Sequence, residues 1–336
     1  MSLFPTVHHV SIATALLSAS VSAAQNLPAG AEERPIATAQ PASTDPMPLT
    51  EKIDEPSLSL SLTAGFIASA KTKGGGEVQR ATIGIDAGYS WSVSDKLTLG
   101  INAGASRQSY DFKNPTLLAG GLKPWKNVNT VELGLSAAYQ LDERWTLISG
   151  GSVVASGTSD ADFNKSLTYG GAVGASYAFS SSLSLGVLLA VQTRLEDNTI
   201  VLPLPILEWT LPLDEDGRWK LGLGSTGSSG VASGGLALTY KASDELDLAL
   251  SLGGIGFGGE FRLDKRGPVP NGVGRDNSTT LTIGADWRPT PAVQIGAYAG
   301  VALSGSLEVL NQNGVRIRKQ DVESAPTFGL RATIGF

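Results

Sequence analysis

The most regular pattern of apolar and polar residues lies at the C-terminus, from Pro326 to Phe336. Apolar residues alternate with small or polar residues along this stretch, and the last residue is aromatic. A period of two predicts a β-strand with one apolar face and one polar face. The length suits a tilted strand that crosses a bilayer, which needs roughly 9–11 residues. The last strand of a soluble β-sandwich would show a similar pattern, so the rest of the chain must distinguish the two.

The same alternation recurs from Ser57 onward, and short polar turns separate the strands. Ser94-Asp95-Lys96 is one such turn: an aromatic residue precedes it, and alternation resumes at Leu97. Short turns flanked by aromatic residues are typical of the periplasmic rim of an outer-membrane barrel. The aromatic residues expected at this rim are Trp91, Tyr139, Phe179, Trp209, Tyr240, Trp287 and Phe336.

Counting one first strand, six hairpins across short turns and the final strand predicts an all-β, transmembrane, antiparallel up-and-down barrel of about 14 strands. An even number is expected of a bacterial single-chain barrel. Twelve strands is the alternative, because Pro203 and Pro205 interrupt the eighth strand. Its residues Leu204 and Ile206 are also out of phase with Leu207, and a β-bulge there would explain the change.

The connections at the other end are mostly longer and polar, which predicts extracellular loops. The last of them contains Asn313-Gly314, a strong signal for a two-residue hairpin turn, so we expect a two-stranded extension there. The predicted loops are Lys71–Glu77, Arg107–Asn127, Gly157–Ser166, Leu195–Thr199, Ser225–Gly230, Gly253–Ser278 and Gly305–Ser324.

Charged residues within the strands lie on the phase opposite to the apolar residues. A charge on the lipid face costs roughly 2–4 kcal/mol at mid-bilayer, so a spanning barrel should turn its charges inward. The polar phase is otherwise mostly Gly, Ser, Thr and Ala, whereas a soluble sandwich would usually expose more Lys, Glu and Arg. The candidate lumen-facing residues are Asp86, Glu132, Asp247, Asp286 and Arg331.

The N-terminal region does not share this alternation. Residues 1–24 combine an apolar core with small residues and predict a signal peptide, cleaved near Ala23 or Ala24. Residues 25–56 are rich in Pro, Ala and acidic residues and predict a disordered linker, with residues 57–336 forming the barrel. This organisation predicts the outer membrane of a Gram-negative bacterium as the location.

Composition excludes several kinds of chemistry. The chain has no cysteine, and its two histidines, His8 and His9, lie in the predicted signal peptide. Catalysis by a Ser-His pair, thiolate or histidine metal sites and haem ligation by histidine are therefore not expected. We predict no catalytic residue, no metal and no cofactor. The formal net charge of −6 argues against a nucleic-acid partner.

One short motif is a false match for a dinucleotide site. Gly254, Gly256 and Gly259 have the spacing G-x-G-x-x-G, but no helix is predicted after them. Glycines in a strand instead permit curvature or close approach.

Two charged clusters lie near the bases of predicted loops. They would form either a constriction at the outer mouth or an ion-pair network that holds the loops, and the second interpretation is favoured. The residues are Arg194, Glu196, Asp197, Arg275 and Asp276.

The stretch from Arg194 to Phe336 resembles a family of uncharacterised bacterial outer-membrane β-barrels, a domain of unknown function. The resemblance implies the barrel fold and the outer-membrane location but no mechanism. The terminal Phe336 also resembles the end of barrels that the barrel assembly machinery recognises. The similarity rests on Arg194–Asp197, Leu202–Pro205, Trp219–Leu221, Phe261–Leu263, Gly272–Asp276, Pro289–Pro291, Gly300–Leu303 and Ala325-Pro326.

The sequence favours a passive or selective pore for small solutes, with membrane lipid and the assembly machinery as partners. The alternative is a non-conducting structural or adhesive barrel that acts through its loops. In that case Tyr110, Phe112 and Trp125 would contact a partner from an extracellular loop. A lipid-active enzyme is disfavoured because the mature chain would lack histidine.

Overall fold

The computed structural model describes residues 56–115, 118–224, 235–253 and 259–336, and most of these residues lie in β-strands. In this part of the chain no helix has the length and apolar character needed to cross a membrane. Two single 3₁₀ turns accompany the strands, η1 (Leu118–Gly121) and η2 (Phe163–Ser166). The strands are β1 (Ser57–Lys71), β2 (Glu77–Ser94), β3 (Leu97–Lys113), β4 (Asn127–Gln140), β5 (Trp145–Thr158), β6 (Leu167–Ala178), β7 (Leu183–Arg194), β8 (Asp197–Leu211), β9 (Trp219–Leu223), β10 (Leu236–Lys241), β11 (Leu246–Gly253), β12 (Gly259–Arg262), β13 (Val273–Thr290), β14 (Val293–Leu310), β15 (Arg316–Val322) and β16 (Ala325–Gly335).

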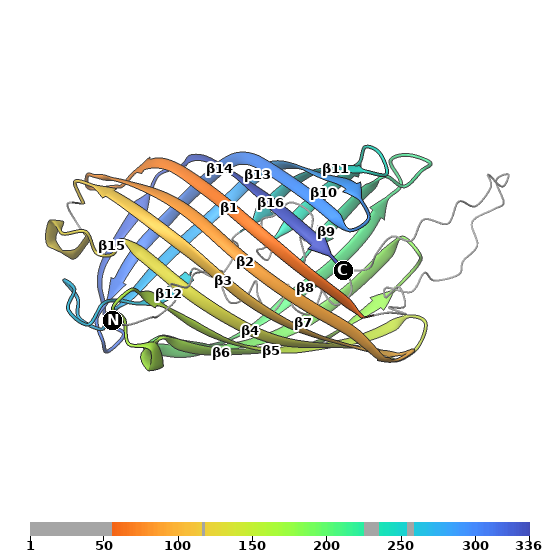
Figure 1. The fold of residues 1–336 in the computed structure, drawn as a ribbon, viewed down its shortest axis with the longest axis horizontal. Helices are drawn as coiled ribbons and strands as arrows, with labels where there is room; N and C mark the ends of the chain where they lie inside the picture. The colour runs from red at the N-terminus through yellow and green to blue at the C-terminus, as the bar shows by residue number, and fades with distance from the viewer. Residues whose placement is uncertain (1–55, 116–117, 225–234, 254–258) are drawn as a thin grey trace.

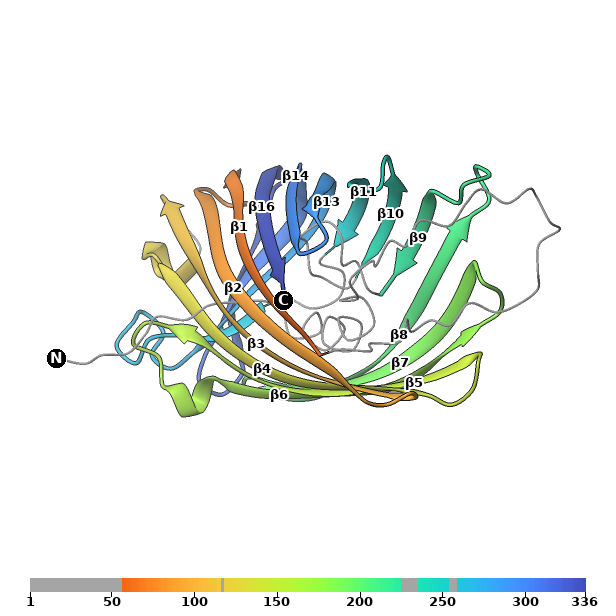
Figure 2. The same cartoon turned by 45° about the vertical axis from the view of Figure 1, so that its right-hand side comes forward.

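Fourteen of these strands form a closed antiparallel ring (Figures 1 and 2). Neighbours in the chain are neighbours in the ring, with β11 beside β13 and β14 beside β16. Pairing of β1 with β16 closes the ring. The strands β12 and β15 pair with β13 and β14 but are not part of the ring. The prediction of fourteen strands is confirmed, and the twelve-strand alternative is wrong.

The two ends of the barrel differ in their connections. One end, here the turn end, carries the short turns, including those at Asp95 and Asp142. The other, here the loop end, carries the longer connections and the β14–β15 hairpin. The turn of that hairpin includes Gly314 at φ 77°, a left-handed conformation that favours glycine. The hairpin extension predicted from Asn313-Gly314 is therefore present.

The strand register places apolar side chains together on the outer surface. Leu62 of β1 lies opposite Ile85 of β2 and Ala332 of β16. The side chains of Ile283 and Leu330 are 68% and 60% exposed because they point away from the barrel. A barrel whose outer surface is apolar is the expected form of a transmembrane barrel, since lipid replaces water around it.

The eighth strand is continuous, contrary to the bulge expected near its prolines. Its pairing with β7 runs without a shift from Leu183 opposite Trp209 to Gln192 opposite Ile200. Leu204 and Ile206 lie on the inner face, in an apolar cluster with Leu188. The phase change in the sequence therefore reflects a strand with apolar residues on both faces. The prolines are tolerated because, among the residues that the structure describes, β9 pairs with β8 only along Leu207–Leu211.

Candidate functional site

The inner wall of the barrel is lined mainly by small residues. Leu135, for example, faces outward, and the next residue, Ser136, is buried on the inner face. Because each strand alternates in this way, the hydroxyl groups of neighbouring strands line the interior. Inward serines and threonines of this kind include Ser90, Ser106, Thr130, Ser136, Thr146, Ser152, Ser156, Thr168, Ser176, Ser184, Thr282 and Thr327.

Three of the five predicted lumenal charges have ionic partners. Asp286 of β13 and Arg331 of β16 lie on either side of Gly296 of β14 in the strand register. The missing side chain at Gly296 leaves room for Arg331 Nη2 to lie 3.3 Å from Asp286 Oδ1. Asp247 of β11 pairs with Arg288, whose Nη2 lies 2.7 Å from Asp247 Oδ2. These charges therefore compensate one another within the wall.

The other two predicted lumenal charges are Asp86 of β2 and Glu132 of β4. They lie on either side of Gly104 of β3. A β-carbon placed at Gly104 would lie 2.7 Å from Asp86 Oδ1 and 3.8 Å from Glu132 Cβ, so both side chains occupy the space above this glycine. Asn102 Nδ2 donates a hydrogen bond to Glu132 Oε1 at 3.3 Å. Among the ion pairs formed by the described residues, none includes either carboxylate.

The sequence analysis missed a further inward charge pair on β8 and β9. Glu208 lies opposite Gly222, and Lys220 lies opposite Thr210, so the two charged residues are diagonal neighbours on one face. Glu208 precedes the rim residue Trp209 in a strand whose phase was ambiguous in the sequence. The alternation of Glu208 with Leu207 and Trp209 was the signal that could have identified it.

At the loop end, β12 lies across the interior of the barrel. It pairs with β13 along one side, and Arg262 forms a parallel bridge with Gly157 of β5 on the other. Ser156 Oγ also donates a hydrogen bond to the Glu260 carbonyl oxygen at 2.8 Å. Because β5 and β13 are distant in the ring, β12 connects two separate parts of the wall.

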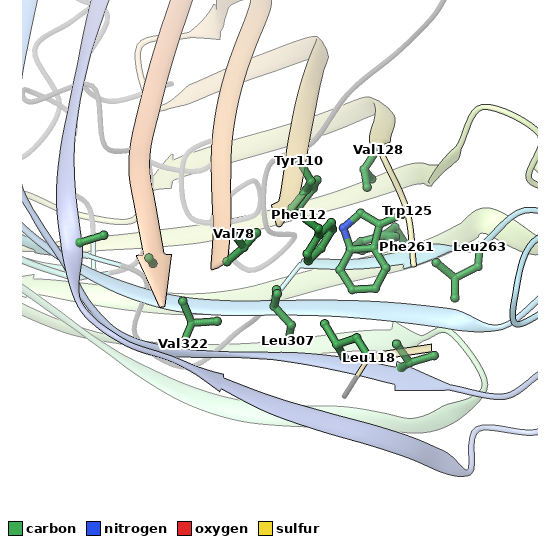
Figure 3. Close-up of a cluster of buried hydrophobic side chains, with 13 residues drawn as sticks. Val78, Tyr110, Phe112, Leu118, Trp125, Val128, Phe261, Leu263, Leu307 and Val322 are labelled. Carbon is green, nitrogen blue, oxygen red and sulfur yellow. The ribbon is translucent and has the colours of Figure 1, made fainter. Parts of the chain in front are cut away.

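Apolar side chains from β12 and from the wall pack together at this end (Figure 3). The ring of Phe261 contacts Trp125 with centroids 4.9 Å apart, and Tyr110 and Phe112 stack beside them. Tyr110, Phe112 and Trp125 are almost completely buried, so the expectation that they are free to contact a partner is wrong. They instead form part of a packed layer, here the mouth cluster, whose members are Ala70, Val78, Tyr110, Phe112, Leu118, Trp125, Val128, Phe261, Leu263, Leu307, Val309, Val322 and Ala325.

The charged residues predicted at the outer mouth form an ion-pair network around Glu260 of β12. Arg194 forms an ion pair with this carboxylate through Nη2, and Arg275 Nε lies 2.6 Å from Glu260 Oε1. Arg275 also pairs with Asp197 at 2.6 Å, and Arg262 with Glu196 at 2.8 Å. The network thus joins β12 to the β7–β8 turn and to β13.

The last of the charged residues predicted at the outer mouth is Asp276 of β13, and it has two buried partners. Arg80 Nη1 of β2 lies 2.6 Å from Asp276 Oδ1, and Tyr110 donates a hydrogen bond to Asp276 Oδ2 at 2.8 Å. The side chains of Arg80 and Asp276 are only 3% and 6% exposed. Arg80, Glu260 and Arg262 were not identified from the sequence, because their partners lie far away in the chain.

At the turn end, aromatic side chains lie near the ends of the strands. Trp145 and Tyr177 lie with ring centroids 4.9 Å apart, and Phe179 contacts Tyr177 at 4.8 Å. In the same region Asp142 accepts hydrogen bonds from the backbone N–H groups of Arg144 and Trp145, each at 2.8 Å. These hydrogen bonds lower the pKa of the Asp142 carboxyl. Each aromatic residue predicted for the rim lies near the end of a strand at the turn end of the barrel. These residues are Trp91, Tyr139, Phe179, Trp209, Tyr240, Trp287 and Phe336.

The described residues contain no group of three or more His, Cys, Asp or Glu side chains arranged to hold a metal ion. Of the glycines in the G-x-G-x-x-G motif, Gly254 and Gly256 lie outside the described residues. Gly259 begins the strand β12.

No protein-family model and no curated protein matches the chain. Among solved structures, the chain is similar to the COG4313 outer membrane channel from Pseudomonas putida F1, with 13% identity and a TM-score of 0.44, over 89% of this chain and 100% of that chain. It is also similar to the P. putida toluene transporter TodX, with 9% identity and a TM-score of 0.40, over 84% and 90%. The NanC porin matches with 10% identity and a TM-score of 0.34, over 82% and 98%.

Proposed function

We propose that the protein is an outer-membrane channel for small solutes, with a constriction at its loop end. The observation that supports this most directly is the inner wall. Fourteen strands enclose a wider interior than the eight-stranded barrels that side chains fill. Here the wall of that interior is built largely from Gly, Ser and Thr, with charges that are mostly paired.

The constriction consists of β12, the mouth cluster and the ion-pair network around Glu260. These groups connect β12 to β5, β13 and the β7–β8 turn, so they narrow the loop end from several sides. A solute that enters from the loop end must pass this layer, whereas the turn-end half is lined by hydroxyl and charged groups. Passage therefore depends on how tightly β12 is held.

We place the barrel in the outer membrane with its turn end toward the periplasm. The apolar outer surface and the aromatic rim support this arrangement. Export would follow from the predicted signal peptide, cleaved near Ala23 or Ala24, which lies outside the described residues. The barrel assembly machinery would recognise the last strand, whose terminal residue Phe336 is exposed at the turn end. No catalytic role is proposed.

A second candidate is a barrel that does not conduct and acts only at the cell surface. The packing of β12 across the loop end favours it, because a permanently held β12 would block passage. The two candidates differ in whether β12 ever leaves its position.

Single-channel conductance tests the proposal. Residues 25–336 would be refolded in detergent, checked for a folded barrel by the heat-dependent shift in gel mobility, and inserted into a planar bilayer. Stable stepwise conductance is the expected result. A folded barrel that inserts and stays silent at all voltages would refute the channel and favour the non-conducting barrel.

A further inference from the structure

The outer surface of the barrel carries an arginine directly beside lipid-facing residues of the loop end. On β3 the outward residues from Leu97 to Ala105 are all apolar, and the next outward residue is Arg107. This apolar stretch is long enough to cross the hydrocarbon core, which needs roughly 9–11 residues of a tilted strand. Arg107 lies opposite Ile83 of β2, whose outward side chain is 62% exposed, and opposite residues of an antiparallel pair share a face. Arg107 therefore points outward at the height where the apolar surface of β3 ends.

The immediate neighbours of Arg107 on this surface are neutral. Asn129 of β4 lies opposite it, and the side-chain amide of Asn127 lies 3.1 Å from its Nη2. Within the part of the chain that the structure describes, no carboxylate forms an ion pair with Arg107. A cation next to hydrocarbon is costly, so a long arginine side chain extends to the headgroup layer and pairs with an anion there. The counter-charge of Arg107 is thus expected in that layer.

Two lysines lie on the same face of the barrel, farther toward the loop end. Lys71 of β1 and Lys113 of β3 lie on either side of Glu77 of β2 in the strand register. Lys113 Nζ lies 3.9 Å from Glu77 Oε2. This single carboxylate leaves a net positive charge on the group of three outward cations, here the basic patch, which consists of Lys71, Arg107 and Lys113. The patch therefore favours an anionic partner.

The basic patch is continuous with the lipid-facing surface. Ile83 lies directly opposite Arg107, and Val131 of β4 is its diagonal neighbour, since Val131 lies opposite Ala105. Ile83 and Val131 are 62% and 40% exposed. A ligand at Arg107 must therefore present a negative charge toward the loop end and an apolar part toward the middle of the barrel. An anionic lipid has both parts, whereas a soluble polyanion has only the first.

We propose that the outer surface of β1–β4 at the loop end binds the phosphate-bearing lipid of the outer leaflet, lipopolysaccharide. A lipid phosphate pairs with Arg107, because the planar guanidinium group matches two phosphate oxygens at once. The acyl chains lie along Ile83 and Val131, and the other two cations of the basic patch attract the rest of the anionic headgroup. The choice of this lipid rests on the proposed location, with the loop end at the cell surface.

Direct lipid binding tests the site without any need for conduction. Refolded residues 25–336 in a mild non-ionic detergent would be titrated with lipid A, the phosphorylated and acylated anchor of lipopolysaccharide. Native mass spectrometry would give the number of bound lipids and the dissociation constant. Lipid A without its phosphates and phosphatidylglycerol would be titrated in parallel, and both should bind more weakly than lipid A.

Arg107→Gln should weaken lipid A binding by roughly fivefold, the effect of one basic residue at an anionic membrane surface. Adding Lys71→Gln should weaken it further by a similar factor. The matched control is Arg318→Gln on β15, the same chemical change at an exposed loop-end arginine that is not part of the basic patch. It should bind lipid A like the wild type. The heat-dependent shift in gel mobility would show that each variant is folded.

Absence of lipid A binding by the folded wild type overturns the site, as does unchanged binding by Arg107→Gln or an equal loss in Arg318→Gln. Equal affinity for the lipid without phosphates would overturn the role of the phosphate, and equal affinity for phosphatidylglycerol would overturn the assignment to lipopolysaccharide. A folded barrel that binds lipid A through Arg107 but never conducts would refute the channel and leave the site standing. A conducting barrel that does not bind lipid A would refute the site alone.

Discussion

Truncation of Phe261 should loosen β12 from the loop end of the barrel. Phe261 is 1% exposed and contacts the rings of Trp125 and Tyr110 within the mouth cluster. β12 is only four residues long and pairs with β13 through four residue pairs. Its position across the interior therefore depends strongly on this one side chain. Phe261→Ala removes the ring and leaves the backbone pairing in place.

The size of the effect follows from the burial of the ring. Replacing a fully buried Phe by Ala typically costs about 3–5 kcal/mol, through lost transfer energy and the cavity that remains. If the ring is buried only when β12 is packed, this energy acts on the equilibrium between packed and released β12. A change of 3–5 kcal/mol corresponds to between roughly two and four powers of ten in that equilibrium.

The assay is single-channel recording, in which the fraction of time spent in the highest conductance level reports released β12. Phe261→Ala should raise this fraction strongly at a given voltage. The matched control is Phe163→Ala in η2, the same chemical change at an exposed loop-end side chain that is 63% accessible. It should leave the fraction unchanged. Barrel stability would be followed separately by urea unfolding in lipid vesicles.

Equal open fractions in the wild type and in Phe261→Ala, with both barrels folded, would refute this reasoning. That result would mean that the ring stays buried during conduction, or that β12 does not limit passage. An equal increase in the control would instead indicate a general loosening of the loops.

Three further changes test other parts of the structure. Asp276→Asn should destabilise the loop end by about 3–5 kcal/mol because it leaves Arg80 buried without its partner, and faster limited proteolysis of the loop end would show it. Gly296→Ala should lower the urea midpoint by an amount equivalent to about 1–3 kcal/mol, because its β-carbon would displace a buried carboxylate from its ion pair. Gly259→Ala, where a β-carbon meets nothing within 4 Å, is its control and should change little. Leu135→Arg on the lipid-facing surface should cost about 2–4 kcal/mol of folding free energy in vesicles, and no loss there would argue against a membrane around β4.

The barrel could be predicted from the sequence because each strand carries its own evidence. In β16 or β4 the alternation alone separates the lipid face from the inner face, and no distant contact is needed. The strand count followed in the same way, since each short turn marks a hairpin. The bulge expected in β8 was wrong. The alternation pattern expects polar residues on the inner face, but Leu204 and Ile206 are apolar residues on that face.

The closure at the loop end could not be predicted, because it depends on contacts between distant parts of the chain. Tyr110 and Asp276 are 166 residues apart, and Glu260 binds Arg194 over 66 residues. Periodicity reports which face of a strand is buried, but not which loop folds across the barrel. The aromatic residues near Trp125 consequently looked like an exposed loop surface in the sequence.

The combination of ion pairs with an apolar layer explains why β12 occupies one position. Phe261 and its neighbours could pack in several similar arrangements, because apolar contacts are not directional. The carboxylate of Glu260 is different, since its two oxygens accept from Arg194 and from the backbone N–H of Leu195. A shift of β12 by one residue would exchange Glu260 for Phe261 and place a charge in the apolar layer, which is costly. The apolar layer thus holds β12 against the wall without fixing its register, and the charges select the register in which β12 crosses the barrel.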